Sequence, residues 1–87
     1  MKCYTYMVRC NDNSLYTGWT TNLQARIKEH NEGESGAKYT RARRPVRLVY
    51  HEEFDTKSAA MKRECEIKRL SKKKKENLVK NHLHKSL

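Results

Sequence analysis

Two tyrosines near the start of the chain could take part in proton transfer if the fold brings their rings together. Tyr6 lies in a run of aromatic and β-branched residues, and Tyr16 lies in a second such run after a short polar break. The pattern predicts a β-hairpin whose three-residue loop ends on Asn13, a residue type that tolerates a positive φ. This register sets Tyr16 opposite Val8 and Gly18 opposite Tyr6. Both rings then share one face, and Gly18 leaves space beside Tyr6. A slip of one residue would separate the rings.

An arginine and a histidine fall on the apolar stripe of the segment that follows. Leu23, Arg26, Ile27 and His30 recur with the i, i+3, i+4, i+7 period of a helix, which we expect to run from a cap at Thr20 or Thr21 to about residue 31. Arg26 could extend its stem over apolar surface and His30 could be a satisfied residue at the rim. The nearby hairpin tyrosines favour a chemical role for both.

A glutamate interrupts the apolar stripe of a second long helix, capped by Asp55 or Thr56. Glu64 lies between Ala60 and Ile67 on that stripe, whereas Glu66 lies roughly 200° around the helix. The pattern therefore predicts a buried Glu64 and a solvated Glu66.

The charge of the chain indicates a polyanionic partner. It carries 20 Lys and Arg against 10 Asp and Glu, a net charge of +10. One cationic group surrounds Tyr39 in the connection 34–44, where we expect a short helix. The other is the run 72–75 at the start of a last helix that begins after Ser71. This run could be a solvated face or could contact phosphates. The candidate nucleic-acid-binding residues are Lys38, Arg41, Arg43, Arg44, Lys72 and Lys73.

Length and composition favour one small intracellular domain. We expect a single domain over residues 1–81 and a disordered tail at 82–87. No run reaches the roughly 20 apolar residues of a spanning helix, so we expect a soluble, cytoplasmic monomer that does not bind membranes. Cys3, Cys10 and Cys65 form no C-x-x-C pair and are interpreted as small buried hydrophobes.

A third strand is predicted after Pro45. Residues 46–54 alternate, with Val46, Leu48 and Tyr50 expected on one face and Arg47, Val49 and His51 on the other. The elements thus follow the order β-β-α-(short α)-β-α-α, an α+β arrangement.

The candidate residues together form a recognisable set. It comprises Tyr6, Tyr16-Thr17-Gly18, Leu23-Gln24-Ala25-Arg26, His30-Asn31 and Glu64. This set resembles the GIY-YIG nuclease domain, and within that superfamily the small stand-alone bacterial group of uncharacterised UPF0213-type proteins. The similarity runs from about Tyr4 to Leu78, with the first motif written here as Tyr4-Thr5-Tyr6 in place of Gly-Ile-Tyr.

The resemblance implies a fold and a mechanism. The fold is a three-stranded antiparallel sheet flanked by helices. The mechanism uses a single Mg²⁺ or Mn²⁺ ion on Glu64, with waters and phosphate oxygens completing its shell. Tyr6 would be the base for the attacking water, and Arg26 would hold the charge that builds on phosphate. Tyr16 and His30 would orient water and phosphate, and which of the two relays a proton stays open.

Two functions of different classes follow. The first is a metal-dependent endonuclease acting on DNA, with recognition of backbone shape as in branched or single-stranded DNA, and with RNA left open. The second is a non-catalytic module that binds nucleic acid through its basic surface. Glu64 discriminates between them, because a carboxylate near phosphate weakens simple binding.

Overall fold

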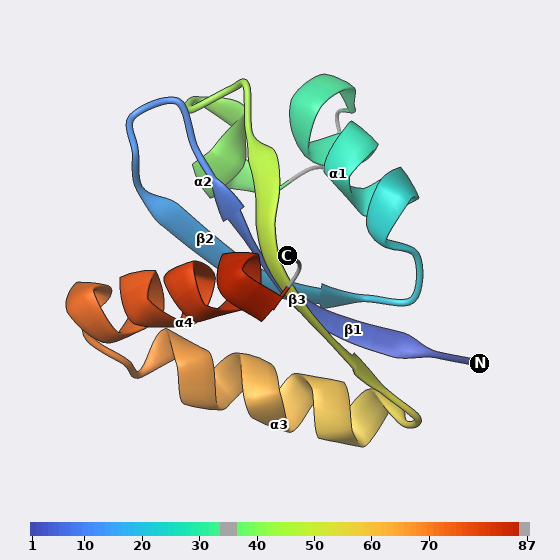
Figure 1. The fold of residues 1–87 in the computed structure, drawn as a ribbon. Coiled ribbons are helices and arrows are strands. Elements are labelled where there is room, and N and C mark those ends of the chain that lie inside the picture. The colour runs from blue at the N-terminus through green and yellow to red at the C-terminus, as the bar shows by residue number, and fades with distance from the viewer. Residues whose placement is uncertain (34–36, 86–87) are drawn as a thin grey trace.

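The first two strands form the hairpin that the sequence predicts (Figure 1). In the computed structural model, which describes residues 1–33 and 37–85, β1 (Cys3–Arg9) pairs antiparallel with β2 (Leu15–Thr20). Tyr6 lies opposite Gly18 and Val8 lies opposite Tyr16. The loop is closed by Cys10, whose backbone N–H donates to the carbonyl oxygen of Ser14 at 2.9 Å, and its last residue, at position 13, has φ 71°. The predicted register is confirmed.

The remaining elements complete a sheet with helices on both faces. β3 (Arg47–Phe54) pairs antiparallel with the other side of β1, which gives the strand order β2-β1-β3. Figure 1 shows α1 (Leu23–Glu32) and α2 (Lys38–Arg41) on one side of the sheet, and α3 (Lys57–Lys68) and α4 (Lys72–Lys85) on the other. The predicted α+β class and the element order, short helix included, are confirmed.

The central strand divides the core in two, because its successive side chains point to opposite faces. Toward α1, Tyr6 and Val8 pack with Cys10 and Val46. Toward α3 and α4, the buried cluster is Met7, Tyr50, Ile67 and Val79. Strand β1 is therefore buried on both faces, and the ring of Tyr6 packs on the α1 face.

A β-bulge in β3 overturns the predicted alternation of that strand. Met7 pairs with Tyr50 but the next residue, Val8, pairs with Leu48, so Val49 has no partner in the register. The extra residue reverses the faces beyond it. Tyr50 consequently joins the α3 and α4 face, and the expectation that it shares a face with Val46 and Leu48 was wrong.

The helix caps differ in part from the prediction. Asn22, rather than Thr20 or Thr21, caps α1, and its side chain accepts from the backbone N–H of Ala25 at 3.1 Å. Thr56 caps α3 as expected, through the backbone N–H of Ala59.

The last helix extends into the segment predicted to be a disordered tail. Helix α4 runs through Lys85, and the ring of His82 lies 5.3 Å from that of Tyr50 and 4.9 Å from that of His51, centroid to centroid. These ring contacts explain why the helix continues past residue 81. Residues 86–87 of the predicted tail lie outside the described residues.

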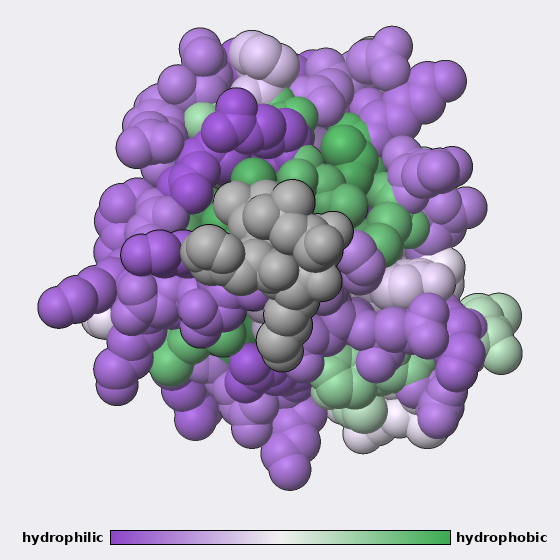
Figure 2. Space-filling model, viewed as in Figure 1, coloured by the Kyte–Doolittle hydropathy of each residue, from purple (hydrophilic) through white to green (hydrophobic). Residues whose placement is uncertain are grey.

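The surface is mainly hydrophilic, with hydrophobic residues gathered over β3 and α1 in the view of Figure 2. Leu23, Ile27 and Leu48 line a shallow apolar hollow there. Cys3 and Cys10 are buried as expected, but Cys65 is exposed, so the interpretation of all three cysteines as buried was wrong. Within the part of the chain that the structure describes, no helix is both long and apolar enough to span a membrane.

Two buried threonines on the α3 face provide a stability prediction. Thr5 donates its hydroxyl to the carbonyl oxygen of Ala60 at 2.7 Å, whereas the hydroxyl of Thr17 has no hydrogen-bond partner among the described residues. Thr17→Val should therefore stabilise the fold by about 1 kcal/mol, because it removes an unsatisfied buried polar group at nearly constant volume. Thr5→Val should destabilise it by about the same amount. Urea denaturation of both variants checks the opposite signs, and a destabilised Thr17→Val would contradict the argument.

Candidate active site

The hydroxyl of Tyr6 is the centre of a polar cluster on the α1 face. Tyr6 is 1% exposed, and its ring lies directly over Gly18 on the neighbouring strand. A Cβ atom at position 18 would stand 2.6 Å from the Tyr6 oxygen, closer than packing allows. The hairpin register and a glycine at that one position therefore fix where the hydroxyl lies.

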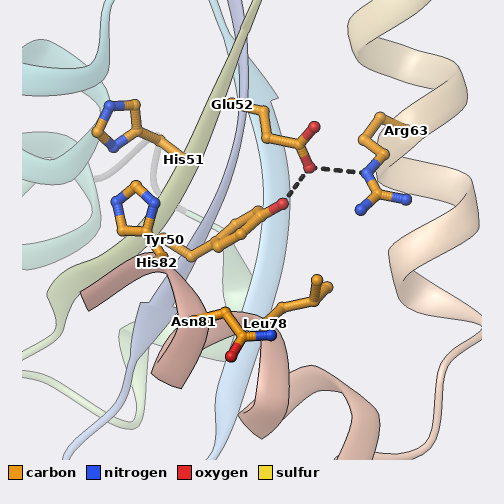
Figure 3. Close-up of a pocket in the computed structure, with 7 residues that line it drawn as sticks. All are labelled: Tyr50, His51, Glu52, Arg63, Leu78, Asn81 and His82. Atoms are coloured by element: carbon orange, nitrogen blue, oxygen red, sulfur yellow. Dashed lines mark hydrogen bonds and ion pairs between the residues drawn. The ribbon is translucent and has the colours of Figure 1, made fainter. Parts of the chain in front are cut away.

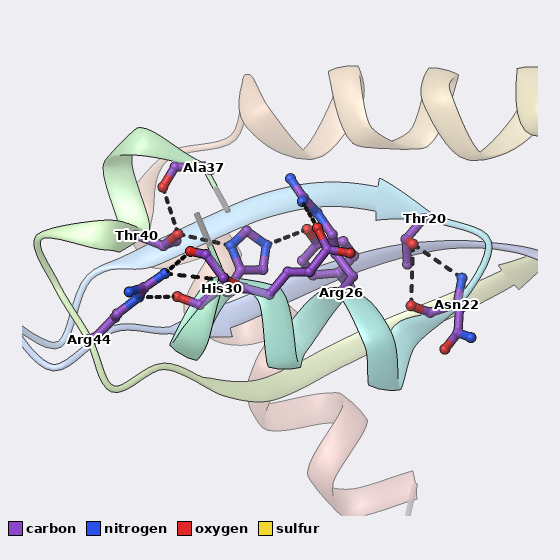
Figure 4. A network of polar contacts seen from close by, with 10 residues as sticks. Thr20, Asn22, Arg26, His30, Ala37, Thr40 and Arg44 are labelled. Carbon is purple, nitrogen blue, oxygen red and sulfur yellow. Dashed lines mark hydrogen bonds and ion pairs between the residues drawn. The ribbon is translucent and has the colours of Figure 1, made fainter. Parts of the chain in front are cut away.

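His30 lies between the two predicted tyrosines. A hydrogen bond of 2.7 Å joins the Tyr6 oxygen to His30 Nε2, and the ring of Tyr16 meets that of His30 edge to face at 5.4 Å between centroids. On its other side, His30 Nδ1 lies 2.8 Å from the hydroxyl oxygen of Thr40 (Figure 4). His30 and Thr40 have no exposed surface. His30 is thus an interior member of the cluster rather than a rim residue.

Burial governs the protonation of this cluster. It raises the pKa of Tyr6 to about 12, although hydrogen bonding and the positive charge of Arg26 act in the opposite direction. Burial also lowers the pKa of His30 to about 4, helped by the charges of Arg26 and Arg44. At neutral pH the phenol is therefore protonated and the imidazole is neutral.

Arg26 extends from α1 (Figure 4), and its hydrogen bond and positive charge both act on the Tyr6 hydroxyl. Its guanidinium pairs with Glu29 at 3.1 Å, and its side chain is 26% exposed. Arg26 and His30 lie on the same stripe of α1, so the guanidinium and the imidazole both approach the Tyr6 hydroxyl.

Glu64 reaches the cluster from the other layer of the fold. Helix α3 packs on β1 and β2, and the negative charge of Glu64 acts on Tyr6. The side chain of Glu64 is 20% exposed and that of Glu66 is 52% exposed, so helical phase separates them in the predicted direction, although Glu64 is half-buried rather than buried. Lys68 lies 3.6 Å from the Glu64 carboxylate.

The donor chemistry of the site fits a hydrated divalent cation. The partly exposed carboxylate of Glu64 is suited to supply one oxygen ligand to an ion, such as Mg²⁺, that keeps most of its waters. The residues described here contain no group of three or more His, Cys, Asp and Glu side chains that could enclose a metal. The ligand set therefore fits an ion held by one carboxylate together with substrate oxygens.

A stack of flat groups leads from the cluster to the surface. The ring of Tyr16 stacks on that of Tyr39 at 5.8 Å, and the guanidinium of Arg43 lies 3.8 Å from the centre of the Tyr39 ring. Arg43 also pairs with Asp12 of the hairpin loop at 3.0 Å. Sequence reasoning placed Tyr39 among cations but did not connect it to Tyr16, and nothing in the sequence pattern indicated Thr40.

Arg44 holds the end of α1 rather than facing solvent. Its guanidinium donates to the carbonyl oxygens of His30 at 2.6 Å, Gly33 at 2.5 Å and Glu29 at 3.3 Å. All three carbonyls lie in or just beyond the last turn of α1, and that of Glu29 also accepts from the backbone N–H of Gly33 at 2.8 Å. The geometry favours a structural role for Arg44, whereas Lys38 and Arg41, from the same segment, are exposed.

A pair of arginine variants separates these roles. Arg44→Ala should lower the free energy of unfolding by about 2 kcal/mol, because a charged donor to three carbonyls is lost. Arg41→Ala should change it by less than about 0.5 kcal/mol and should instead weaken DNA binding at every sequence, with a salt slope smaller by up to roughly 0.9 for duplex DNA. Thermal unfolding and salt-dependent binding titrations distinguish the two variants. An Arg44→Ala protein as stable as the parent would contradict the role of Arg44 in holding the end of α1.

The hairpin loop joins the two predicted basic segments. The ammonium of Lys72 donates to the carbonyl oxygen of Asn13 at 3.2 Å and lies 3.4 Å from Glu76, and Lys73 beside it is exposed. Since Arg43 binds Asp12 in the same loop, the two segments lie on either side of one loop. Both segments therefore contact the same loop, and Asp12 and Glu76 pair with one cation of each.

A cavity of about 590 Å³ lies away from this cluster, on the α3 and α4 face (Figure 3). Tyr50 and Arg63 both donate there to the carboxylate of Glu52, so the charges are satisfied within the protein. None of the predicted site residues is among the lining residues Tyr50, His51, Glu52, Arg63, Leu78, Asn81 and His82. The cavity and the Tyr6 cluster are therefore separate features of the fold.

Comparison with known proteins identifies the family of the chain. The family model described as the GIY-YIG catalytic domain matches residues 2–77. A UPF0213 protein of Natronomonas pharaonis is 62% identical over 76 residues, which covers 87% of this chain and 88% of the relative. A UPF0213 protein of Staphylococcus haemolyticus is 59% identical, over 90% of this chain and 94% of the relative.

Two solved structures share the arrangement. The solution NMR structure of a UPF0213 protein from Bacillus halodurans is 50% identical, with a TM-score of 0.59 over 92% of this chain and 84% of that chain. A protein from E. faecalis, also solved by NMR, is 42% identical, with a TM-score of 0.62 over 93% and 85% of the two chains.

Proposed function

The chain belongs to the GIY-YIG catalytic domain family, and from this membership we propose that it is a metal-dependent endonuclease that hydrolyses phosphodiester bonds in DNA. The observation that carries the proposal is the cluster in which the buried Tyr6 hydroxyl meets His30 at 2.7 Å, with the cation of Arg26 and the carboxylate charge of Glu64 acting on the same hydroxyl. A base, a cation for phosphate and a metal-binding oxygen are the groups that this hydrolysis needs.

Each residue has a role in this mechanism. Tyr6 is the base toward the attacking water, and Arg26 stabilises the negative charge that develops on the phosphate oxygens. His30 holds the Tyr6 hydroxyl through their hydrogen bond, and Tyr16 packs edge to face on His30. Because both ring nitrogens of His30 are bonded inside the protein, the orientation of water and phosphate falls to Tyr16. Because burial keeps the pKa of Tyr6 high, the positive charge of Arg26 is needed to favour loss of its proton.

Glu64 would hold the divalent ion, Mg²⁺ or Mn²⁺. When bound, the ion would supply Lewis-acid chemistry that polarises the phosphoryl group and stabilises the leaving 3′ oxygen. The Glu64 carboxylate would have to loosen its 3.6 Å contact with Lys68 to bind the ion, and half-burial leaves it accessible.

The basic surface around the hairpin loop supports nucleic-acid binding through the backbone. Lys38 and Arg41 from one segment and Lys73 from the other are exposed, and a net charge of +10 favours a polyanion. Contacts of this kind read shape rather than sequence, so we propose branched or single-stranded DNA as the substrate class. The second candidate function, a non-catalytic binding module, is favoured by the same surface.

A panel of labelled DNAs tests the proposal. Duplex, single-stranded, flap, fork and four-way-junction DNA are incubated with the protein and Mg²⁺ or Mn²⁺, with EDTA as the control and a matched set of RNAs alongside. We expect cleavage of at least one DNA structure that EDTA abolishes. Binding of the whole panel without cleavage under either metal would favour the binding module.

A further inference from the structure

Four hydrogen-bonding groups form a line from the backbone of Ala37 to the phenol of Tyr6. The hydroxyl of Thr40 donates to the carbonyl oxygen of Ala37 at 2.9 Å, and the Thr40 oxygen lies 2.8 Å from His30 Nδ1. His30 Nε2 lies 2.7 Å from the Tyr6 oxygen. The three side chains are at most 1% exposed, so water does not compete for these bonds.

The donor and the acceptor of each hydrogen bond in this line can be worked out from the Ala37 carbonyl at its end. A carbonyl oxygen can only accept, and that of Ala37 accepts from the Thr40 hydroxyl at 2.9 Å as well as from the backbone N–H groups of Thr40 and Arg41 at 3.1 Å, so the shortest of these bonds takes up the single Thr40 proton. The Thr40 oxygen must therefore accept from His30, which places the imidazole proton on Nδ1. Because the pKa of His30 is lowered to about 4, the ring is neutral and its Nε2 has only a lone pair. Tyr6 must then donate its proton to Nε2.

We propose that Thr40 is a positioning residue that fixes His30 in the Nδ1–H tautomer. The phenol proton of Tyr6 then points toward His30 Nε2 and away from the substrate. The proposal rests on the proposed function for its catalytic consequence. With its proton held by His30, the Tyr6 oxygen presents lone pairs to the site, where Arg26 can donate to one of them. A lone pair remains to take a proton from the attacking water while the phenol proton passes to His30 Nε2, so that the phenol ends neutral and the imidazole becomes an imidazolium.

In the opposite tautomer of His30, the Tyr6 oxygen would no longer present a lone pair to the attacking water. An Nε2–H group would donate to the Tyr6 oxygen, which already interacts with Arg26, and the phenol proton would turn toward the substrate. Tyr6 would then face the attacking water as a donor. The hydroxyl of Thr40 does not contact the substrate, but through His30 it determines whether Tyr6 accepts a hydrogen bond from the attacking water or donates one to it.

Nitrogen-15 NMR of the imidazole tests the proposal without any assay of activity. In the parent protein at neutral pH, we expect His30 to show a protonated Nδ1 and an unprotonated Nε2. Thr40→Val keeps the shape and removes the acceptor, and we expect it to shift the ring toward the Nε2–H form. Thr40→Ser keeps the hydroxyl and should preserve the parent tautomer. Thr40→Ala provides a second variant without the hydroxyl should the valine variant fail to fold.

Cleavage kinetics supply the second measurement. Thr40→Val should reduce kcat by about tenfold or more with little change in KM, and Thr40→Ser should restore kcat. A parent His30 protonated at Nε2, or a Thr40→Val protein with the parent tautomer and kcat, would overturn the proposal. If the parent cuts no DNA while the NMR results are as expected, the nuclease assignment fails and the role of Thr40 in fixing the tautomer stands.

Discussion

Glu64→Gln should abolish metal-dependent cleavage while leaving DNA binding intact or slightly stronger. The amide keeps the size of the side chain but loses the charge that would bind the ion, and a negative charge near phosphate is removed. Because Glu64 is paired only loosely with Lys68, at 3.6 Å and near the surface, the free energy of unfolding should stay within about 0.5 kcal/mol of the parent. Cleavage assays over a range of Mn²⁺ concentrations, together with binding titrations in EDTA, measure the two effects separately.

Glu66→Gln is the matched control, since it makes the same chemical change two residues further along the same helix. Glu66 is 52% exposed and lies 3.4 Å from Arg63, on the solvated side of α3. Its replacement should leave cleavage unchanged. An active Glu64→Gln enzyme would remove the nuclease assignment from this site, and an inactive Glu66→Gln enzyme would mean that the metal is held on the other side of the helix.

Tyr6→Phe should lower turnover by about 100-fold or more while KM for DNA changes little. The variant keeps the ring that packs over Gly18 and deletes only the hydroxyl that bonds His30 Nε2. Loss of that hydrogen bond leaves a buried acceptor unsatisfied, so the free energy of unfolding should fall by about 1 kcal/mol. Single-turnover cleavage and urea denaturation of the same sample distinguish the chemical effect from the structural one.

Tyr50→Phe makes the same substitution at a tyrosine of the opposite face. Tyr50 is 6% exposed and donates its hydroxyl to Glu52, so the variant also loses a largely buried hydrogen bond. It should lose stability but cleave at the parent rate. Equal rates for Tyr6→Phe and the parent would make Tyr6 a packing residue only, and a slow Tyr50→Phe would indicate that turnover depends on general stability.

Local rules were sufficient to predict the parts of the site that lie within single elements. Loop length and the residue types around Asn13 determined the hairpin register, which placed Tyr6 and Tyr16 on one face. Helical period distinguished Glu64 from Glu66 because a helix repeats regularly along one face. In both cases the determining geometry lies within one hairpin or one helix.

Features that depend on contacts between distant segments could not be predicted in this way. The bulge at Val49 reflects the fit of β3 against β1, and no residue within 46–54 indicates it. The same holds for Thr40, whose role arises only when the chain returns to His30 ten residues later, and for Arg44, which folds back onto the end of α1. The connection between α1 and β3 therefore contributes residues to the interior of the site as well as to the surface.

The order of the strands also has a consequence for the time course of folding. Strand β1 pairs with β2 through a three-residue loop, but it pairs with β3 only after the whole segment that contains α1 and α2 has been brought back. Closing the short loop costs far less chain entropy than closing the long one. We therefore expect the hairpin, and with it the contact between Tyr6 and Gly18, to form early, and the approach of Glu64 to come late. The Glu64 carboxylate, which distinguishes a nuclease from a binding module, would then be one of the last groups to reach its native position.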